Sequence, residues 1–256
     1  MNKLIQTLSQ VKQKPIGLMT HVVIGYPNLE ETKNIVVTMA KNGADIIELQ
    51  IPFSDPLADG PTIMKACEKA LENGIKVADA FRLMQELSQR VLVPLLFMCY
   101  YNTVFNFGIE KFIKRAKEAG CEGLIVPDMP IEEEQYEHFY NLCNKYNLPA
   151  IFVVSPATTN QRLQQIQRMA NGFVYATARQ GITGARSLLD NATIEFLQRV
   201  RKHIVIPIAV GFGISEKTHI EQLQGHADIA VVGSAIIHKI TEKKGVSDFI
   251  RSLVIK

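Results

Sequence analysis

The chain has 256 residues, of which 47% are hydrophobic and 21% charged, and it contains no tryptophan. This composition excludes a mainly disordered protein, because it supplies enough apolar side chains for a large core. The formal net charge is only +3, and the absence of a long basic run argues against a nucleic-acid partner. The length suits a single domain over residues 1–256, since α/β barrels commonly occupy about 250 residues.

The N-terminal segment and the cysteines indicate a cytoplasmic protein. The first 18 residues suit a short amphipathic helix and lack the apolar block of a signal peptide. The longest apolar run, residues 91–101, contains Pro94 and is shorter than the roughly 20 residues that span a bilayer, so we expect no membrane segment. The cysteines are far apart and lack zinc-ligand spacing, which favours reduced, buried thiols: Cys67, Cys99, Cys121 and Cys143.

Short β-branched runs alternate with longer amphipathic segments along the whole chain. The expected strands cover residues 17–24, 44–51, 93–99, 123–126, 150–154, 172–176, 205–210 and 228–232. The expected helices cover residues 29–42, 61–73, 77–89, 108–119, 131–146, 160–170, 191–203, 216–223 and 235–240. This pattern predicts an α/β protein, a (β/α)8 TIM barrel with an extra N-terminal helix. A doubly wound open sheet is the alternative, which periodicity alone does not exclude.

An acidic segment follows the second expected strand. Strand alternation places Glu48 on the opposite face from Ile47 and Leu49. If Glu48 faces the lumen of a barrel, it is a partly desolvated carboxyl, and desolvation moves a carboxylic acid toward proton exchange near neutral pH. If it faces outward, it pairs with a lysine of a helix. Asp55 and Asp59 follow in a proline-rich loop, where either could instead cap the next helix.

Glycine-rich turns follow the last two expected strands. Residues 211–213 allow close backbone approach, and residues 233–234 open a short helix whose free N–H groups suit a phosphate. The corresponding place in (β/α)8 barrels often binds phosphate, although turns use glycine for other reasons too. Residues 179–186 carry two glycines and are expected to form a mobile loop.

The segment Pro52-Phe53-Ser54-Asp55-Pro56-Leu57-Ala58-Asp59-Gly60-Pro61, preceded by Glu48, resembles the signature of the α subunit of tryptophan synthase. The resemblance covers essentially the whole chain. Further matching segments lie behind expected strands, at residues 25–27, 100–102, 127–130, 181–184, 211–214 and 233–235.

The resemblance implies a lyase of L-tryptophan biosynthesis that cleaves indole-3-glycerol phosphate to indole and glyceraldehyde 3-phosphate by a retro-aldol reaction. It implies that Glu48 is the acid/base, that Asp59 accepts the indole N–H, and that Tyr175 positions Glu48. The residues implied to bind indole are His21, Tyr100, Thr183 and Phe212, with Thr183 bonding Asp59 when the 179–186 lid closes. The residues implied to bind phosphate are Gly184, Gly213, Gly233, Ser234 and Ala235.

The resemblance also implies a partner, a β subunit that receives indole in an α2β2 heterotetramer. The loops around residues 52–60, 101–107 and 127–133 are expected on the face that meets it. No metal or organic cofactor is expected in this chain, because pyridoxal phosphate belongs to the β subunit.

Several residues depart from the family pattern. Gln50 stands where glycine is usual, Ala178 where serine is usual and Thr103 where proline is frequent, and residues 20–23 replace a Pro-Phe-x-Thr segment. His21 is the most consequential of these; its alternative role is a packed histidine with satisfied nitrogens. Three hypotheses remain: a working lyase, a barrel that only activates its β partner, and another phosphate-binding barrel such as an epimerase or prenyl transferase.

Overall fold

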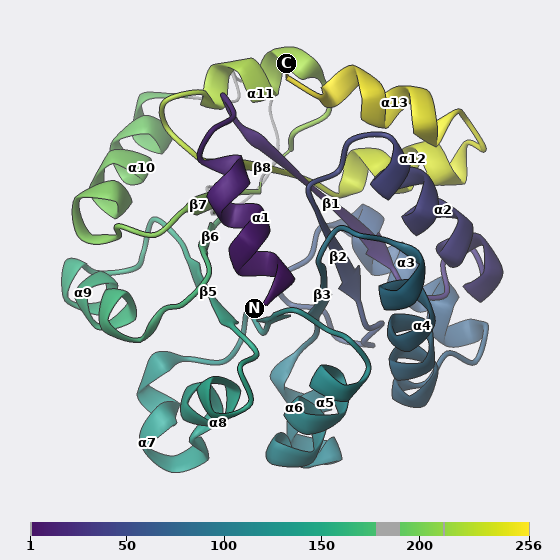
Figure 1. The fold of residues 1–256 in the computed structure, drawn as a ribbon, viewed down its shortest axis with the longest axis horizontal. Helices are drawn as coiled ribbons and strands as arrows, with labels where there is room; N and C mark the ends of the chain where they lie inside the picture. The colour runs from purple at the N-terminus through teal and green to yellow at the C-terminus, as the bar shows by residue number, and fades with distance from the viewer. Residues whose placement is uncertain (1, 178–189, 212, 256) are drawn as a thin grey trace.

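The computed structural model describes residues 2–177, 190–211 and 213–255. Eight parallel strands form a closed barrel in which each strand pairs with its neighbours in chain order and β8 pairs with β1. Helices surround this barrel on its outside (Figure 1). The closed sheet confirms the predicted (β/α)8 fold and excludes the doubly wound alternative, whose sheet has open edges.

Every expected strand is present, although most are shorter than the apolar runs. The strands are β1 (Gly17–Val23), β2 (Ile46–Gln50), β3 (Leu95–Met98), β4 (Leu124–Ile125), β5 (Ala150–Val154), β6 (Val174–Ala176), β7 (Ile208–Val210) and β8 (Ile229–Val232). The helices are α1 (Lys3–Val11), α2 (Leu29–Lys41), α3 (Pro61–Glu72), α4 (Val77–Arg90), α5 (Tyr101–Phe107), α6 (Ile109–Glu118), α7 (Glu134–Glu137), α8 (Phe139–Lys145), α9 (Asn160–Met169), α10 (Asn191–His203), α11 (Lys217–Leu223), α12 (Ser234–Thr241) and α13 (Val246–Leu253). No helix in these described parts is long and apolar enough to cross a membrane.

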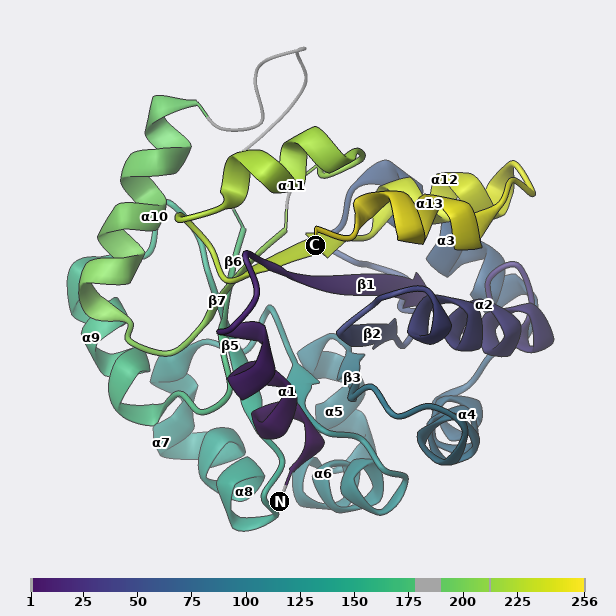
Figure 2. The same ribbon diagram turned by 45° about the horizontal axis from the view of Figure 1, so that its top comes forward.

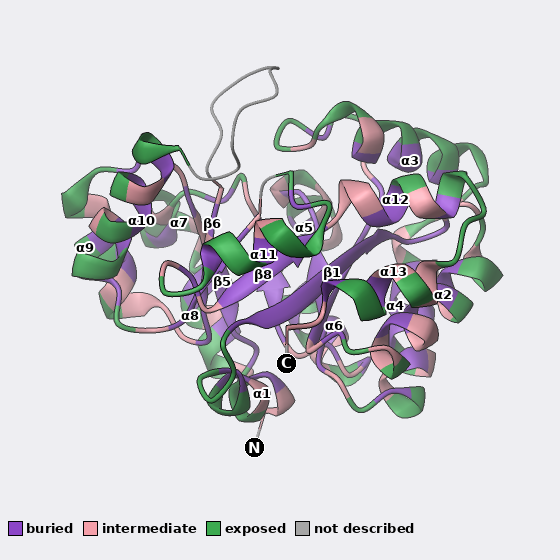
Figure 3. Ribbon diagram, turned by 90° about the horizontal axis from the view of Figure 1, so that it is seen from above, coloured by how far each residue is buried: buried purple, intermediate pink, exposed green. Residues whose placement is uncertain are grey.

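Strand alternation divides the buried side chains into two cores. In β2, Ile47 and Leu49 point outward and pack in the large core between the strands and the helices. Ile46 points inward and belongs to a separate core inside the barrel. Figure 3 shows the buried strands at the centre and exposed residues on the outer faces of the helices.

Helix α1 closes the amino end of the barrel. Its N-cap residue Asn2 accepts a hydrogen bond from the backbone N–H of Leu4 at 2.9 Å. Leu4, Leu8 and Val11 belong to the interior core, because they lie on one face of the helix. The helix lies across the barrel opening in Figure 1 and beside its amino end in Figure 2. In the described part of the chain, α1 therefore fills this end of the barrel interior.

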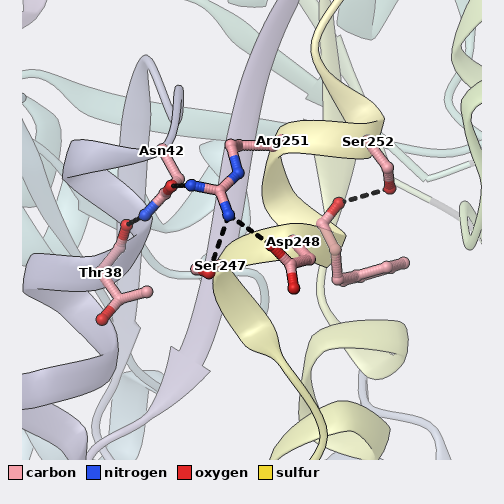
Figure 4. A network of polar contacts seen from close by, with 7 residues as sticks. Thr38, Asn42, Ser247, Asp248, Arg251 and Ser252 are labelled. Atoms are coloured by element: carbon pink, nitrogen blue, oxygen red, sulfur yellow. Dashed lines mark hydrogen bonds and ion pairs between the residues drawn. The ribbon is translucent and has the colours of Figure 1, made fainter.

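Helix α13, which the sequence patterns did not indicate, packs on α2 through a polar network. The Arg251 guanidinium donates to Asn42 Oδ1 at 3.0 Å and also contacts Asp248 and Ser247 (Figure 4). The Asn42 side chain in turn donates to the carbonyl of Thr38 at 2.7 Å. The network ties the end of the chain to the helix that follows β1.

The single helix expected over residues 131–146 is wrong. A short 3-10 turn (Ile131–Glu133) precedes α7, and the helix breaks at His138, whose φ is +53°. The Glu134 carboxylate accepts hydrogen bonds from the backbone N–H groups of Tyr140 at 2.6 Å and Asn141 at 2.9 Å. Glu134 therefore caps the free backbone donors at the start of α8, and this cap stabilises the break between the two helices. Residues 101–107, expected as a loop, form α5.

We expect Glu134→Ala to lower the free energy of unfolding by about 1–3 kcal/mol, because two backbone donors lose their charged acceptor. Urea denaturation followed by circular dichroism measures this change. The exposed neighbour Glu133 provides the control, since Glu133→Ala should change stability by less than about 0.5 kcal/mol. Equal stability of the two variants would contradict the capping role.

Candidate active site

A cavity of about 800 Å³ lies at the carboxyl ends of the strands. Every strand supplies it with a side chain or with the residue that follows the strand: His21, Glu48, Met98, Ile125, Val153, Tyr175, Gly211 and Val231. Ligands of (β/α)8 barrels bind at this end because the loops that follow the strands meet there. The cavity therefore brings together seven of the predicted site residues from distant parts of the sequence: His21, Glu48, Asp59, Tyr175, Gly213, Gly233 and Ser234.

Glu48 faces the lumen, so the alternative in which it points outward to a helix lysine is wrong. It shares the inward face of β2 with Ile46 and is only 3% exposed. On the neighbouring strand, His21 stands directly opposite in the parallel register. The imidazole Nδ1 lies 3.4 Å from Glu48 Oε2. The buried carboxyl is thus placed beside a group that can carry the opposite charge.

Asp59 lies in the loop between β2 and α3, where two side chains bind it. Its Oδ2 accepts hydrogen bonds from Gln50 Nε2 at 2.6 Å and from the Tyr100 hydroxyl at 3.0 Å. The Tyr100 oxygen also accepts from the N–H of Ala58 at 2.9 Å, which fixes the loop next to Asp59. Burial raises the pKa of Asp59 above its ordinary value, although the Gln50 hydrogen bond opposes the rise.

Helix capping does not explain the acidic loop. Helix α3 has Gly60 at its N-cap, with no side-chain hydrogen bond there, and Pro61 at its first position. The Asp55 carboxylate instead accepts from Ser54 Oγ at 2.5 Å. Asp59 is left free to face the cavity, and Phe53 stacks on Tyr100 with ring centroids 5.2 Å apart.

Tyr175 packs against the backbone of Gly211. A Cβ atom on Gly211 would overlap the phenol ring and its hydroxyl. Burial, with the charges of Glu48 and Asp59, raises the pKa of Tyr175 well above its usual value, so the hydroxyl stays protonated. The glycine after β7 therefore admits the ring of Tyr175 to the cavity wall.

The other end of the cavity is formed after β7 and β8. Gly213, Gly233 and Ser234 line it, and Gly213 has a φ of +60°, which favours glycine. Gly233 is the N-cap of α12 and forms no side-chain cap, and Ala235 follows in the first turn. Free N–H groups at such a helix start suit an anion. The carboxylates and these donors therefore belong to the same cavity.

Thr183 and Gly184 of the expected lid, Phe212 and the departure Ala178 lie outside the described residues.

Tyr100, predicted to contact indole, is buried behind Asp59, to which it donates.

The sequence reasoning missed two polar side chains, Gln50 behind Asp59 and Arg162 at the cavity. Gln50 was noted only as a departure from a pattern, although its place two residues after Glu48 predicts an inward orientation. Arg162 lines the cavity and donates from Nε to Glu132 at 2.9 Å, which bridges α9 to the segment after β4. Its position in an amphipathic helix gave no signal of this. Among the described residues, no group of three or more potential ligands could hold a metal ion.

A (β/α)8 barrel with two carboxyl groups and a helix start around one cavity defines a class, the barrel enzymes that use acid–base chemistry at the carboxyl ends of their strands. The model of the family "Tryptophan synthase alpha chain" matches residues 7–252. The tryptophan synthase alpha chain of Desulfotalea psychrophila is 43% identical, with 94% of this chain and 95% of the relative aligned. The chain therefore belongs to the tryptophan synthase alpha chain family.

Solved structures agree with this assignment. The tryptophan synthase subunit alpha of Legionella pneumophila superposes with a TM-score of 0.88 at 30% identity, covering 99% of this chain and 97% of that one. A chain of the tryptophan synthase complex from Pyrococcus furiosus has a TM-score of 0.83 at 31% identity, with 93% and 97% covered. The family resemblance expected from the 52–61 segment is thus confirmed.

We expect Gly211→Ala to displace Tyr175 and to destabilise the protein by about 1–3 kcal/mol, the usual cost of an added methyl group in a packed site. Chemical denaturation measures the cost, and a crystal structure of the variant shows the position of the ring. Gly60→Ala is the control, because a Cβ there meets no atom within 4 Å. An unmoved Tyr175 in the Gly211→Ala variant would contradict this packing role.

Proposed function

We propose that the protein cleaves indole-3-glycerol phosphate to indole and glyceraldehyde 3-phosphate in tryptophan biosynthesis. The observation that carries this proposal is the inward Glu48 carboxyl, buried at the wall of the cavity that also holds Asp59. Membership of the tryptophan synthase alpha chain family supports the same reaction. Four free, buried cysteines fit a cytoplasmic enzyme.

In the proposed reaction, Glu48 moves two protons. Its carboxylic acid gives a proton to indole C3, which produces a cation on the ring. The resulting carboxylate takes the proton of the side-chain hydroxyl while the carbon–carbon bond breaks, and the bonding electrons neutralise the ring. Glu48 recovers as many protons as it gives, so no external acid or base is consumed.

Asp59 stabilises the charge that develops on the ring. As a carboxylate it accepts the indole N–H, and this interaction strengthens as the ring becomes cationic. Gln50 and Tyr100 hold its Oδ2 from behind, which leaves the other oxygen for the substrate. Tyr175 limits the movement of Glu48 by occupying the opposite wall of the cavity.

The phosphate of the substrate binds at the start of α12. Gly213, Gly233, Ser234 and Ala235 provide backbone donors there, and the helix dipole favours the anion. The substrate then spans the cavity, with its indole ring beside β2 and its phosphate after β7 and β8. Thr183, Gly184 and Phe212 complete the proposed binding set.

The proposed partner is a tryptophan synthase β subunit in an α2β2 complex. Segments that follow β2, β3 and β4 expose large apolar side chains. Leu57 of the loop after β2 is 92% exposed, Phe105 of α5 is 54% exposed, and Tyr136 of α7, just beyond the expected segment 127–133, is 70% exposed. Apolar residues of this size in water are typical of a protein interface. Pyridoxal phosphate is assigned to the β subunit.

Purified protein incubated with indole-3-glycerol phosphate, with and without a β subunit, tests this function through the release of indole. We expect release that increases when the β subunit is present. A stable complex that releases no indole under either condition would overturn the proposed activity and favour the scaffold hypothesis.

We expect Glu48→Gln to lower indole release by at least about 100-fold, because the amide has the same size but cannot exchange the proton. Substrate binding, measured by calorimetry, should persist because the phosphate end is unchanged. Glu68→Gln on the exposed face of α3 is the matched control and should retain full activity. Near-normal turnover of Glu48→Gln would show that another group is the acid/base.

A further inference from the structure

His21 is a buried imidazole that faces the proposed acid/base. It lies on the inward face of β1, is 6% exposed, and has Glu48 as its register partner on β2. Its Nδ1 is 3.4 Å from Glu48 Oε2, and this contact joins the two adjacent strands. The position is fixed by the strand pairing, because both side chains must point into the lumen.

The polar atoms of this pair have few other partners. Within the described residues, His21 Nε2, Glu48 Oε2 and Gln50 Oε1 are buried and form no hydrogen bond. A buried carboxylate beside a neutral imidazole would lack a compensating charge, which is costly at low dielectric. One proton on the pair removes this cost, since it gives either two opposite charges or two neutral groups.

The charges that face His21 favour that proton. Glu48 comes from β2 and Asp59 from the loop after it, and the neutral Gln50 of β2 also lies near the ring. On the other side, after β8, stands Gly233, which has no titratable side chain. Tyr175 of β6 faces the two carboxyl groups as a neutral phenol. Burial lowers the pKa of His21, but Glu48, Asp59 and Gln50 outweigh it and the pKa is raised above 6.5.

We propose that His21 and Glu48 hold one proton between them, and that His21 is a positioning residue that stores this proton for Glu48. This inference rests on the proposed function for its catalytic meaning. In the resting pair the proton is on Nδ1 of an imidazolium beside the carboxylate. Transfer to Oε2 leaves a neutral imidazole and the carboxylic acid that protonates indole C3. Both forms hold the same number of protons, so the transfer needs none from solvent.

The separation of 3.4 Å is compatible with this transfer. Hydrogen bonds of active sites are often long without substrate and shorten in the complex. After Glu48 recovers a proton from the hydroxyl, the pair again holds one proton. His21 never contacts the reacting atoms in this scheme and acts only through Glu48.

The first test is a nuclear magnetic resonance titration of the histidines in the full chain, which requires no activity. We expect the pKa of His21 to fall by at least about one pH unit in Glu48→Gln, because burial then acts without the opposing carboxylate. His21→Asn assigns the resonance. Glu68→Gln on the exposed face of α3 is the control and should leave the His21 titration unchanged.

An unchanged His21 titration in Glu48→Gln, or an imidazole that is neutral at pH 6 in the unmodified protein, would overturn the proposal. Neither result depends on indole release, so it leaves the proposed lyase activity standing. Conversely, absence of lyase activity with the expected titration would overturn the function and retain the shared proton.

The stability of His21→Asn gives the same information if Glu48→Gln does not fold. Because the pKa of His21 is raised in the native state, its proton stabilises the protein fully below about pH 6.5, the unfolded value. This stabilisation is lost as the pH rises through the native pKa. We expect the unfolding free energy to fall more between pH 6 and 8 in the unmodified protein than in His21→Asn. Identical changes would contradict the proposal.

The second test is the pH profile of kcat/KM for indole release. In His21→Asn one of the two proton sites is gone, so the remaining proton is lost more readily and the alkaline limb should move down by about one pH unit or more. The KM should change little, because the phosphate end is intact. A lower rate with an unmoved limb would show that His21 is only a packing residue.

Discussion

Closure of the barrel is the constraint on which the site depends. In a closed sheet no strand lies at an edge, and each strand has one face toward the lumen and one toward the helices. Every side chain of a strand therefore points either into the lumen or toward the helices. Ile46, Glu48 and Gln50 share the inward face of β2 for this reason, although only the first is apolar. Their placement is a consequence of the outward packing of Ile47 and Leu49. A one-residue shift would bury the carboxyl among the outer helices.

Burial removes water from the two carboxyl groups, so neighbouring residues must stabilise their charge. The neighbours of Asp59 and those of Glu48 do so in different ways. Asp59 receives neutral donors from Gln50 and Tyr100, which favour its carboxylate without adding charge. Glu48 receives a titratable neighbour, His21, which can give up its charge together with the carboxyl. The first arrangement suits a group that remains ionised. The second suits a group that must change its protonation state, and this difference matches the two roles proposed for the carboxyl groups.

The sequence predicted those features of the fold and the site that follow from the periodicity of the strands. Continuous apolar runs identified all eight strands, and alternation left Glu48 with two orientations, of which the outward packing of Ile47 and Leu49 selects the inward one. The break at His138 was not predictable, because its cap comes from Glu134 within the preceding turn and follows no residue pattern. The contact of Gln50 with Asp59 depends on the path of a loop, which periodicity does not describe. Gly211 was assigned to phosphate approach, and its close contact with Tyr175 depends on a side chain from another strand.

The order of the strands also places the proposed phosphate end of the cavity close to the carboxyl groups. β1 stands between β2 and β8, and His21 lies between Glu48 on one side and Gly233 on the other. A Cβ at 233 would lie 3.4–3.5 Å from His21, in ordinary van der Waals contact. His21 therefore packs between the acid/base and the start of α12. Binding energy from a phosphate held there can fix the indole ring against Glu48, because both contacts are built on strands of the same rigid barrel.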